Sequence, residues 1–318
     1  MRKQVAREHG LKSGSASADW IVTRRDFLKV SASVAAALST APLDARAWSA
    51  ESAAKVRFGI VTDAHYADTQ RRGSRYYRQS VAKMAECVGR MNDEKVDFLI
   101  ELGDFKDQGA PAVEKDTIEY LRTIEKAFHG FQGPCYHVLG NHDADSISKE
   151  QFLAVVKNTN VPAGSKYYSF DLRGLHFVVL DANYRADGSD YDHGNFNWTD
   201  ANLPDAELKW LKRDLASTPK PVIAFVHQQL DGKGSHYIKN AEAVRQILEK
   251  HKRVLAVFQG HNHAGHYSRI EGIHYYTLKA MVEGSGADNN AYAVVEVYGD
   301  HGMSITGYRK AVSKAAQG

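Results

Sequence analysis

The segment VRFGIVTDAH, residues 56–65, decides the fold, because an apolar run ends there in two polar side chains. The run at residues 56–61 is continuous rather than alternating, which is typical of a strand buried on both faces of a sheet. Asp63 and His65 follow at once, where the strand gives way to a loop. We therefore expect a layered α/β domain in which strand ends carry functional side chains.

Four further blocks repeat this arrangement. Apolar runs at residues 96–102, 135–139, 222–226 and 254–258 lead into polar blocks. These blocks are Gly103-Asp104, Gly140-Asn141-His142-Asp143, Val226-His227 and Gly260-His261-Asn262-His263. Because the carboxyl ends of strands in one sheet meet at one crevice, side chains far apart in the sequence converge there. The predicted ligands of a two-metal hydrolytic site are Asp63, His65, Asp104, Asn141, His227, His261 and His263.

The composition is that of a folded enzyme rather than a disordered chain. The 318 residues are 43% hydrophobic, which is enough for a large core in one α/β domain. The net charge of +3 comes from residues 1–47, which hold eight Lys or Arg and four Asp or Glu. The remaining 33 basic and 34 acidic residues give −1, and this near-neutral body does not favour a nucleic acid as partner.

The first 47 residues have the features of an export signal. TRRDFLK at residues 23–29 resembles the twin-arginine motif, and an Ala-rich apolar stretch follows at residues 30–43. Ala45-Arg46-Ala47 supplies a small-x-small cleavage site. An amphipathic or transmembrane helix is the alternative, but the stretch is shorter than the roughly 20 residues that span a bilayer. We expect the twin-arginine export machinery to carry the folded protein to the bacterial periplasm or the cell exterior.

The mature protein is expected to have neither a disulfide framework nor a stable membrane anchor. Its two cysteines are Cys87, in a predicted helix, and Cys135, at the start of a predicted strand. Residues 1–50 hold no cysteine for a lipid anchor, and no later apolar stretch is long enough to span a bilayer.

The rest of the chain alternates helices with strands. Apolar side chains at positions 77, 81, 84, 88 and 91 form the stripe of an amphipathic helix. Residues 167–172 and 175–180 indicate a hairpin that turns at Arg173-Gly174. Two mixed sheets packed face to face between helical layers accommodate these elements. The expected divisions are a signal peptide at 1–47, a linker at 48–55, one domain at 56–309 and a frayed tail at 310–318.

The five blocks, in this order, resemble the calcineurin-like metallophosphoesterase family, whose pattern is D-x-H, GD, GNH[DE], H and GHxH. The resemblance covers residues 56–308. It implies a four-layer α-β-β-α sandwich of two mixed sheets flanked by helices. It also implies a division of the ligands into Asp63, His65 and His263 for one metal, Asn141, His227 and His261 for the other, and Asp104 bridging both.

The ligand types predict the cofactor. Carboxylate, imidazole and amide oxygen suit two divalent ions of Mn, Fe or Zn, with Mn favoured, and the lack of a thiolate argues against a structural zinc site. Two such ions lower the pKa of a shared water, so that a metal-bridging hydroxide attacks the phosphorus and no side-chain nucleophile is required.

Two further residues of the third block have expected catalytic roles. The resemblance gives His142 a place facing the substrate, where it protonates the leaving oxygen or stabilises the transition state. Asp143 beside it is predicted to orient the imidazole through the distal nitrogen. A structural hydrogen bond between the two is the alternative.

Substrate choice depends on the loops. The loop after the first block is basic, because it contains Arg71, Arg72 and Arg75. We expect it to bind a second phosphate or a carboxylate of the substrate. The alternative is that it is only a solvated surface. Residues 75–80, 166–170 and 196–198 are similar to the branch with manganese-dependent ADP-ribose and CDP-alcohol diphosphatases. The aromatic-rich segment at residues 182–204 is either a lid over a base or an Ω-like loop packed on itself.

The prediction is an exported dinuclear-metal hydrolase of a small phosphorylated substrate. Phosphomonoesters, phosphodiesters and nucleoside-diphosphate esters all fit the predicted ligands. One alternative is a non-catalytic module that binds phosphoryl ligands, which the complete ligand set disfavours. The other is a two-metal hydrolase of a non-phosphate substrate, which has no use for the basic loop.

Overall fold

The computed structural model describes residues 54–316, whose strands form two six-stranded mixed sheets. The first sheet has the order β12 (Lys314–Ala316), β11 (Met303–Arg309), β10 (Ala291–Val297), β1 (Val56–Val61), β2 (Phe98–Glu101) and β3 (Cys135–His137). The second has the order β4 (Tyr168–Leu172), β5 (Leu175–Val179), β6 (Val222–Val226), β7 (Val254–Gln259), β9 (Ile273–Thr277) and β8 (His266–Ile270).

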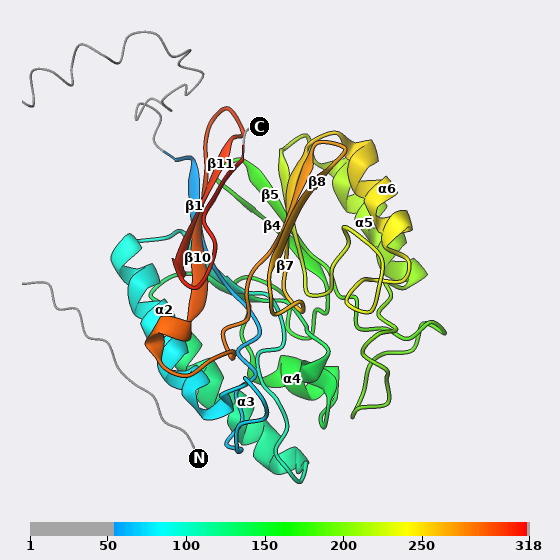
Figure 1. The fold of residues 1–318 in the computed structure, drawn as a ribbon. Helices are drawn as coiled ribbons and strands as arrows, with labels where there is room; N and C mark the ends of the chain where they lie inside the picture. The colour runs from blue at the N-terminus through cyan, green and yellow to red at the C-terminus, as the bar shows by residue number, and fades with distance from the viewer. Residues whose placement is uncertain (1–53, 317–318) are drawn as a thin grey trace, which may run out of the picture. The chain divides into compact units, whose positions relative to one another are not determined.

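Helices cover the outer face of each sheet (Figure 1). The first sheet packs against α2 (Ser80–Glu94), α3 (Glu114–Phe128) and α4 (Lys149–Val155), and the second against α5 (Asp205–Ser217) and α6 (Ala241–His251). Three short 3-10 helices are η1 (Tyr77–Gln79), η2 (His142–Ala144) and η3 (Ala287–Asn289). The predicted four-layer α-β-β-α sandwich is confirmed.

The inner faces of the two sheets share one apolar core. Phe58 of β1 meets Phe177 of β5 and Phe225 of β6 edge to face, with ring centroids 5.8 Å apart in each pair. All three rings are fully buried. Edge-to-face pairs of this kind add to the gain from burying the rings, so the sheets are held in a defined face-to-face register.

Parallel strands bring the predicted polar blocks to the same end of the sandwich. Strands β1, β2 and β3 run parallel in the first sheet, and β5, β6, β7 and β9 run parallel in the second. The loops after β1, β2, β3, β6 and β7 carry the five blocks. The predicted pair of sheets is confirmed, and each sheet feeds the site: β1, β2 and β3 belong to one, and β6 and β7 to the other.

The hairpin and the tail compare differently with expectation. β4 and β5 form the predicted hairpin, and Arg173 and Gly174 at its turn have the positive φ values of 46° and 78° that a two-residue turn of this kind requires. Within the predicted frayed tail, residues 314–316 form β12, which pairs with β11 in an antiparallel register. The signal predicted at 1–47 and most of the linker lie outside the described residues.

Two further expectations concern membranes and thiols. Within residues 54–316, every helix is too short or too polar to cross a bilayer. Cys87 and Cys135 are both buried and unbridged.

Candidate metal centre

The structure brings the predicted ligands of the five loops together. The Asp104 carboxylate lies 3.1 Å from Nε2 of His227 and 3.5 Å from Nε2 of His65. Nε2 of His263 lies 3.3 Å from Oδ1 of Asp63 and 3.2 Å from Nε2 of His65. Asp104 thus lies between two groups of side chains, as a bridging ligand must.

Of the four groups of side chains within the described residues that are compact enough to hold a cation, two consist entirely of predicted ligands. In each group the donor atoms lie within 4.8 Å of one another. The first group is Asp63, His65 and His263, and the second is Asp104, His227 and His261. Both match the division of ligands that the sequence predicts, apart from Asn141, whose amide is described next.

Buried atoms without hydrogen-bond partners mark the centre as a cation site. Oδ1 of Asn141 and Nε2 of His227 and His261 are buried and make no aligned hydrogen bond, and the same holds for Oδ1 of Asp63. Buried polar atoms are otherwise almost always paired, since an unpaired one costs free energy. All four are electron-pair donors, so divalent metal ions fit the residues present.

The backbone of the ligand loops adopts conformations that are rare for residues with side chains. Asp63, His65, Asp104 and His261 have φ values of 52°, 46°, 56° and 65°, in the left-handed region. A Cβ on Gly103 would lie 2.5 Å from Nδ1 of His227, and one on Gly140 would lie 2.1 Å from the backbone nitrogen of Asp104. The glycines of the GD and GNH blocks are therefore required by close approach of the loops.

Oxygen atoms behind the rings orient the histidine ligands. Nδ1 of His227 lies 2.8 Å from the Leu102 carbonyl oxygen, and Nδ1 of His263 lies 2.6 Å from Oε1 of Glu283. These contacts leave Nε2 of each ring for the centre, as outer partners of metal-bound histidines commonly do. Glu283 was not among the predicted site residues, because it lies after β9 outside every polar block.

The charges at the centre oppose one another in the metal-free protein. Burial raises the pKa of Asp104, but His227, His142 and His65 outweigh it and hold that pKa well below its usual range. Burial lowers the pKa of His227, but Asp104 raises it to about 9. The side chains thus neutralise each other where cations would otherwise do so.

The predicted contact between Asp143 and the His142 ring is wrong. The buried Asp143 carboxylate accepts hydrogen bonds from backbone N–H groups of the loops after β2 and β3, among them Gly140 at 2.8 Å. Nδ1 of His142 instead lies 3.2 Å from Oδ1 of Asp107, without hydrogen-bond alignment. Successive residues of the 3-10 helix η2 point in different directions, so neighbours 142 and 143 do not face each other.

Of the three arginines predicted to bind substrate, one lines the metal pocket. That pocket has a volume of about 270 Å³, and its wall includes Arg75, His142 and Asn141. Arg75 lies 3.9 Å from Asp107 and 4.0 Å from Glu283. Arg71 lines a separate hollow beside Tyr76, and Arg72 is exposed.

Two aromatic rings complete the pocket. Trp198, from the 182–204 segment, is 41% exposed, and its ring lies 5.5 Å from that of His261 and 5.4 Å from that of His236. The aromatic residues of this segment were predicted to be important, whereas His236 was not, because it lies in the loop after β6 and belongs to no block. A flat aromatic surface therefore borders the group of ligands that contains His261.

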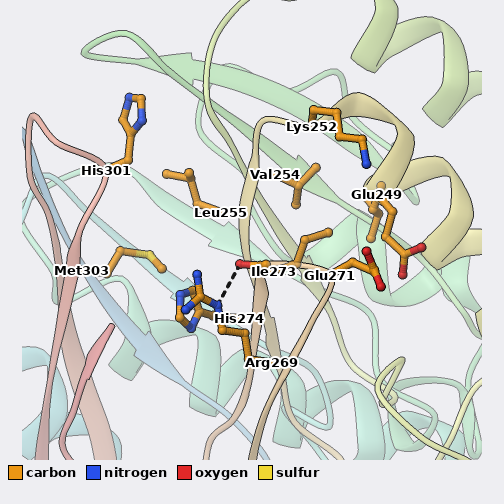
Figure 2. A pocket seen from close by; sticks show the side chains of 12 residues that line it. Glu249, Lys252, Val254, Leu255, Arg269, Glu271, Ile273, His274, His301 and Met303 are labelled. Carbon is orange, nitrogen blue, oxygen red and sulfur yellow. Dashed lines mark hydrogen bonds between the residues drawn. The ribbon is translucent and has the colours of Figure 1, made fainter. Parts of the chain in front are cut away.

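A second cavity of about 250 Å³ lies away from the ligands. It is lined by the start of β7, the turn between β8 and β9, and the segment that enters β11 (Figure 2). Lys252, Arg269, Glu249 and Glu271 give it charges of both signs around apolar side chains. None of the seven predicted ligands lines it, so the chemistry belongs to the other cavity.

Comparisons with known proteins agree with this geometry. The rice (Oryza sativa subsp. japonica) protein named manganese-dependent ADP-ribose/CDP-alcohol diphosphatase is 28% identical over 290 residues, which cover 76% of this chain and 88% of that protein. Its Arabidopsis thaliana namesake is 25% identical over 79% of this chain and 93% of its own length. The crystal structure of a dimetal phosphatase from Danio rerio matches with a TM-score of 0.72 at 22% identity, covering 83% of this chain and 99% of that one.

The family profile described as calcineurin-like phosphoesterase matches residues 56–265. This range holds all five ligand-bearing blocks. The predicted enzyme class and divalent-metal cofactor are confirmed, while the roles of single ligands stay predictions. Because the match spans well over half of the sequence, the chain belongs to the calcineurin-like phosphoesterase family and is a hydrolase of that kind.

Proposed function

We propose that this protein is a manganese-dependent diphosphatase that cleaves the diphosphate bond of a nucleoside diphosphate joined to a sugar or an alcohol. The observation that carries the proposal is one pocket lined jointly by predicted metal ligands, the Arg75 guanidinium and the Trp198 ring. Relatives named ADP-ribose/CDP-alcohol diphosphatases, which align over 88% and 93% of their own lengths, support it.

The proposed centre holds two divalent ions. Asp63, His65 and His263 hold one, and Asn141, His227 and His261 hold the other, with the Asp104 carboxylate between them. When bound, such a pair supplies a nucleophilic water at neutral pH and stabilises charge on the phosphoryl group. Nitrogen and oxygen donors without a thiolate suit manganese.

His142 is the proposed general acid. Its Nδ1 faces Asp107 at 3.2 Å, which leaves Nε2 for the pocket that the ring lines. Its backbone N–H donates a 2.7 Å hydrogen bond to Oδ1 of Asp104, which holds the backbone of His142 beside the centre. From this position Nε2 gives its proton to the leaving phosphate oxygen.

Arg75 and Trp198 select the two ends of the substrate. The contacts of Arg75 with Asp107 and Glu283, at 3.9 and 4.0 Å, are much longer than the roughly 2.7–2.9 Å of a charge-assisted hydrogen bond. Its guanidinium therefore keeps free donors for the oxygens of the second phosphate. The exposed face of Trp198 offers a stacking surface for the base.

A substrate panel tests the proposed function. The purified protein is assayed with and without Mn²⁺ against ADP-ribose, CDP-choline, p-nitrophenyl phosphate and bis-p-nitrophenyl phosphate, beside Asp104→Ala and Asn141→Ala variants. We expect Mn²⁺-dependent turnover that favours the two diphosphates and is lost in both variants. A preference for a p-nitrophenyl ester contradicts the proposed substrate class. No turnover with two bound ions favours a binding module or a non-phosphate substrate.

We also propose export of the folded protein through the twin-arginine pathway. The supporting motif, with Arg24 and Arg25, lies outside the described residues. A bacterial host expressing the full chain should hold it in the periplasmic fraction, and an Arg24→Lys, Arg25→Lys variant should remain in the cytoplasm. Equal distribution of the two proteins contradicts export by this route.

A further inference from the structure

The 182–204 segment, which joins β5 to α5, contacts the metal loops through the buried amide of Asn183. Its Nδ2 donates to the Leu139 carbonyl oxygen at 2.7 Å and to Oδ1 of Asp181 at 2.9 Å. Its Oδ1 accepts from Nε2 of Gln228 at 2.7 Å. Both amide hydrogens and the oxygen are therefore engaged, which fixes the orientation of the side chain.

Both loops that Asn183 contacts carry ligands predicted for the same metal ion. Leu139 lies two residues before Asn141, and Gln228 directly follows His227. The hydrogen bond from Gln228 Nε2 goes to Asn183, and Oε1 of Gln228 has no hydrogen-bond partner. Asn183 thus sets the separation between the loops after β3 and β6.

A buried ion pair holds Asn183 in place. Nζ of Lys149 donates to Asp181 at 2.6 Å and to Asp190 of the 182–204 segment at 2.8 Å. Lys149 is 1% exposed, and Asp181 and Asn183 are fully buried. Hydrogen bonds in such surroundings are strong and their geometry is stiff. The position of the 182–204 segment and the spacing of the two loops are therefore mechanically linked.

We propose that Asn183 is a positioning residue that couples the 182–204 segment to the second half of the metal centre, formed by Asn141, His227 and His261. The inference rests on the proposed function only in taking the centre to hold two divalent ions. Without the amide the two loops are free to separate, so the second half loses metal affinity. The half formed by Asp63, His65 and His263 keeps its affinity, because the hydrogen bonds of the Asn183 amide go to the loops after β3 and β6 instead.

Manganese binding to the metal-free protein tests the coupling without a substrate. Free Mn²⁺ is measured by electron paramagnetic resonance during a titration of wild type and Asn183→Leu. We expect two bound ions in wild type. In Asn183→Leu we expect one site unchanged and the other weakened up to about tenfold, the lower end of the 10–100-fold loss for a direct outer partner, because Asn183 acts on the ligands through Leu139 and Gln228. The signal of a coupled Mn²⁺ pair should appear only at higher Mn²⁺.

Asn202→Leu is the matched control. Asn202 also belongs to the 182–204 segment, but its Nδ2 bonds the backbone oxygens of Tyr184 and Asp200 within that segment. It should bind both ions as wild type does. Gln228→Met removes only the link to the His227 loop, and it should weaken the same single site by a smaller factor, which keeps the test open if Asn183→Leu folds poorly.

The outcomes separate the two proposals. Two unchanged sites in Asn183→Leu and Gln228→Met, or equal weakening of both sites, overturn the coupling while leaving the proposed function intact. Fewer than two ions in wild type overturn the dinuclear centre of the proposed function, and the coupling with it.

Discussion

The Asp143 carboxylate holds the backbone of two metal loops. Its replacement by asparagine distinguishes this structural role from the role predicted from the sequence, in which Asp143 orients the His142 ring. The side chain is fully buried. Its donors are the backbone N–H groups of Asp104, Gly140, Phe105 and Lys106, at 3.1, 2.8, 3.0 and 3.3 Å. Two of these donors lie on each carboxylate oxygen, so the carboxylate joins the loop after β2 to the loop after β3.

The size of the effect follows from this geometry. Asparagine keeps one acceptor oxygen and places an NH₂ group where the other was, so two buried N–H groups lose their acceptor. Each costs about 1–3 kcal/mol, which predicts a loss of about 2–6 kcal/mol in the free energy of unfolding for Asp143→Asn. That is a large part of the roughly 5–15 kcal/mol of a typical domain. Asp143→Ala strands all four donors, at about 4–12 kcal/mol, and should barely fold.

Urea unfolding in EDTA measures the stability without any contribution from bound metal. Asp107→Asn is the matched comparison, because Asp107 lies beside the His142 ring. Asp143→Asn should unfold at lower urea and leave the His142 limb of kcat/KM against pH unshifted. Burial lowers the pKa of His142 and Asp107 raises it, so Asp107→Asn should shift the His142 limb of that profile to lower pH. A free energy of unfolding of Asp143→Asn within about 0.5 kcal/mol of wild type, the usual range for a surface substitution, contradicts this role of the carboxylate. So does a profile shifted like that of Asp107→Asn.

Three other perturbations have defined outcomes. Arg75→Ala should raise KM for ADP-ribose about 10–100-fold, because a hydrogen bond to a charged group is lost. It should change KM for p-nitrophenyl phosphate, which has no second phosphate, far less. Equal changes for both substrates argue against binding of the second phosphate by Arg75. Trp198→Ala should raise KM for ADP-ribose about tenfold and Trp198→Phe less, and identical KM values for both variants and wild type contradict stacking. Burial raises the pKa of Glu125, but His137 and His129 lower it from 4.5 to about 2. The stabilisation by ionised Glu125 is fully present above pH 4.5 and is lost as the pH falls through 2. The free energy of unfolding of Glu125→Gln should therefore be lower by up to about 3 kcal/mol at pH 7, and it should change less between pH 5 and 2, as measured by urea unfolding.

The sequence reached the fold and the ligands because both depend on local pattern. A buried parallel strand needs a continuous apolar run, and the polar block after each run marks the carboxyl end. Asp63, Asp104 and His261 could therefore be located without knowing which strands are neighbours. The prediction of two sheets came from the hairpin and the family resemblance, because the apolar runs do not say which sheet each strand joins: burial on both faces looks the same in either sheet.

The outer partners could not be predicted, because they depend on where side chains point in three dimensions. Glu283 reaches His263 from a loop twenty residues further along the chain. Asp107 follows Asp104 by three residues, yet its contact with His142 depends on the turn of η2. Adjacency in sequence suggested Asp143 for that role, and adjacency is a poor guide to contact in a helical turn.

The backbone of the ligand loops explains how the centre can be ordered before a metal arrives. Four ligands have positive φ, and each such residue costs about 1–3 kcal/mol, so together they oppose folding by about 4–12 kcal/mol. Backbone hydrogen bonds between the loops after β1 and β2 maintain the conformations of Asp63, His65 and Asp104, among them Asp63 N–H to the Gly103 carbonyl at 3.0 Å and His65 N–H to the Asp104 carbonyl at 2.8 Å. These bonds continue the parallel pairing of β1 and β2 beyond the strands themselves. The strain is therefore opposed by the sheet and its buried core, not by metal binding. A divalent ion that binds needs to displace protons and water but does not need to order the loops.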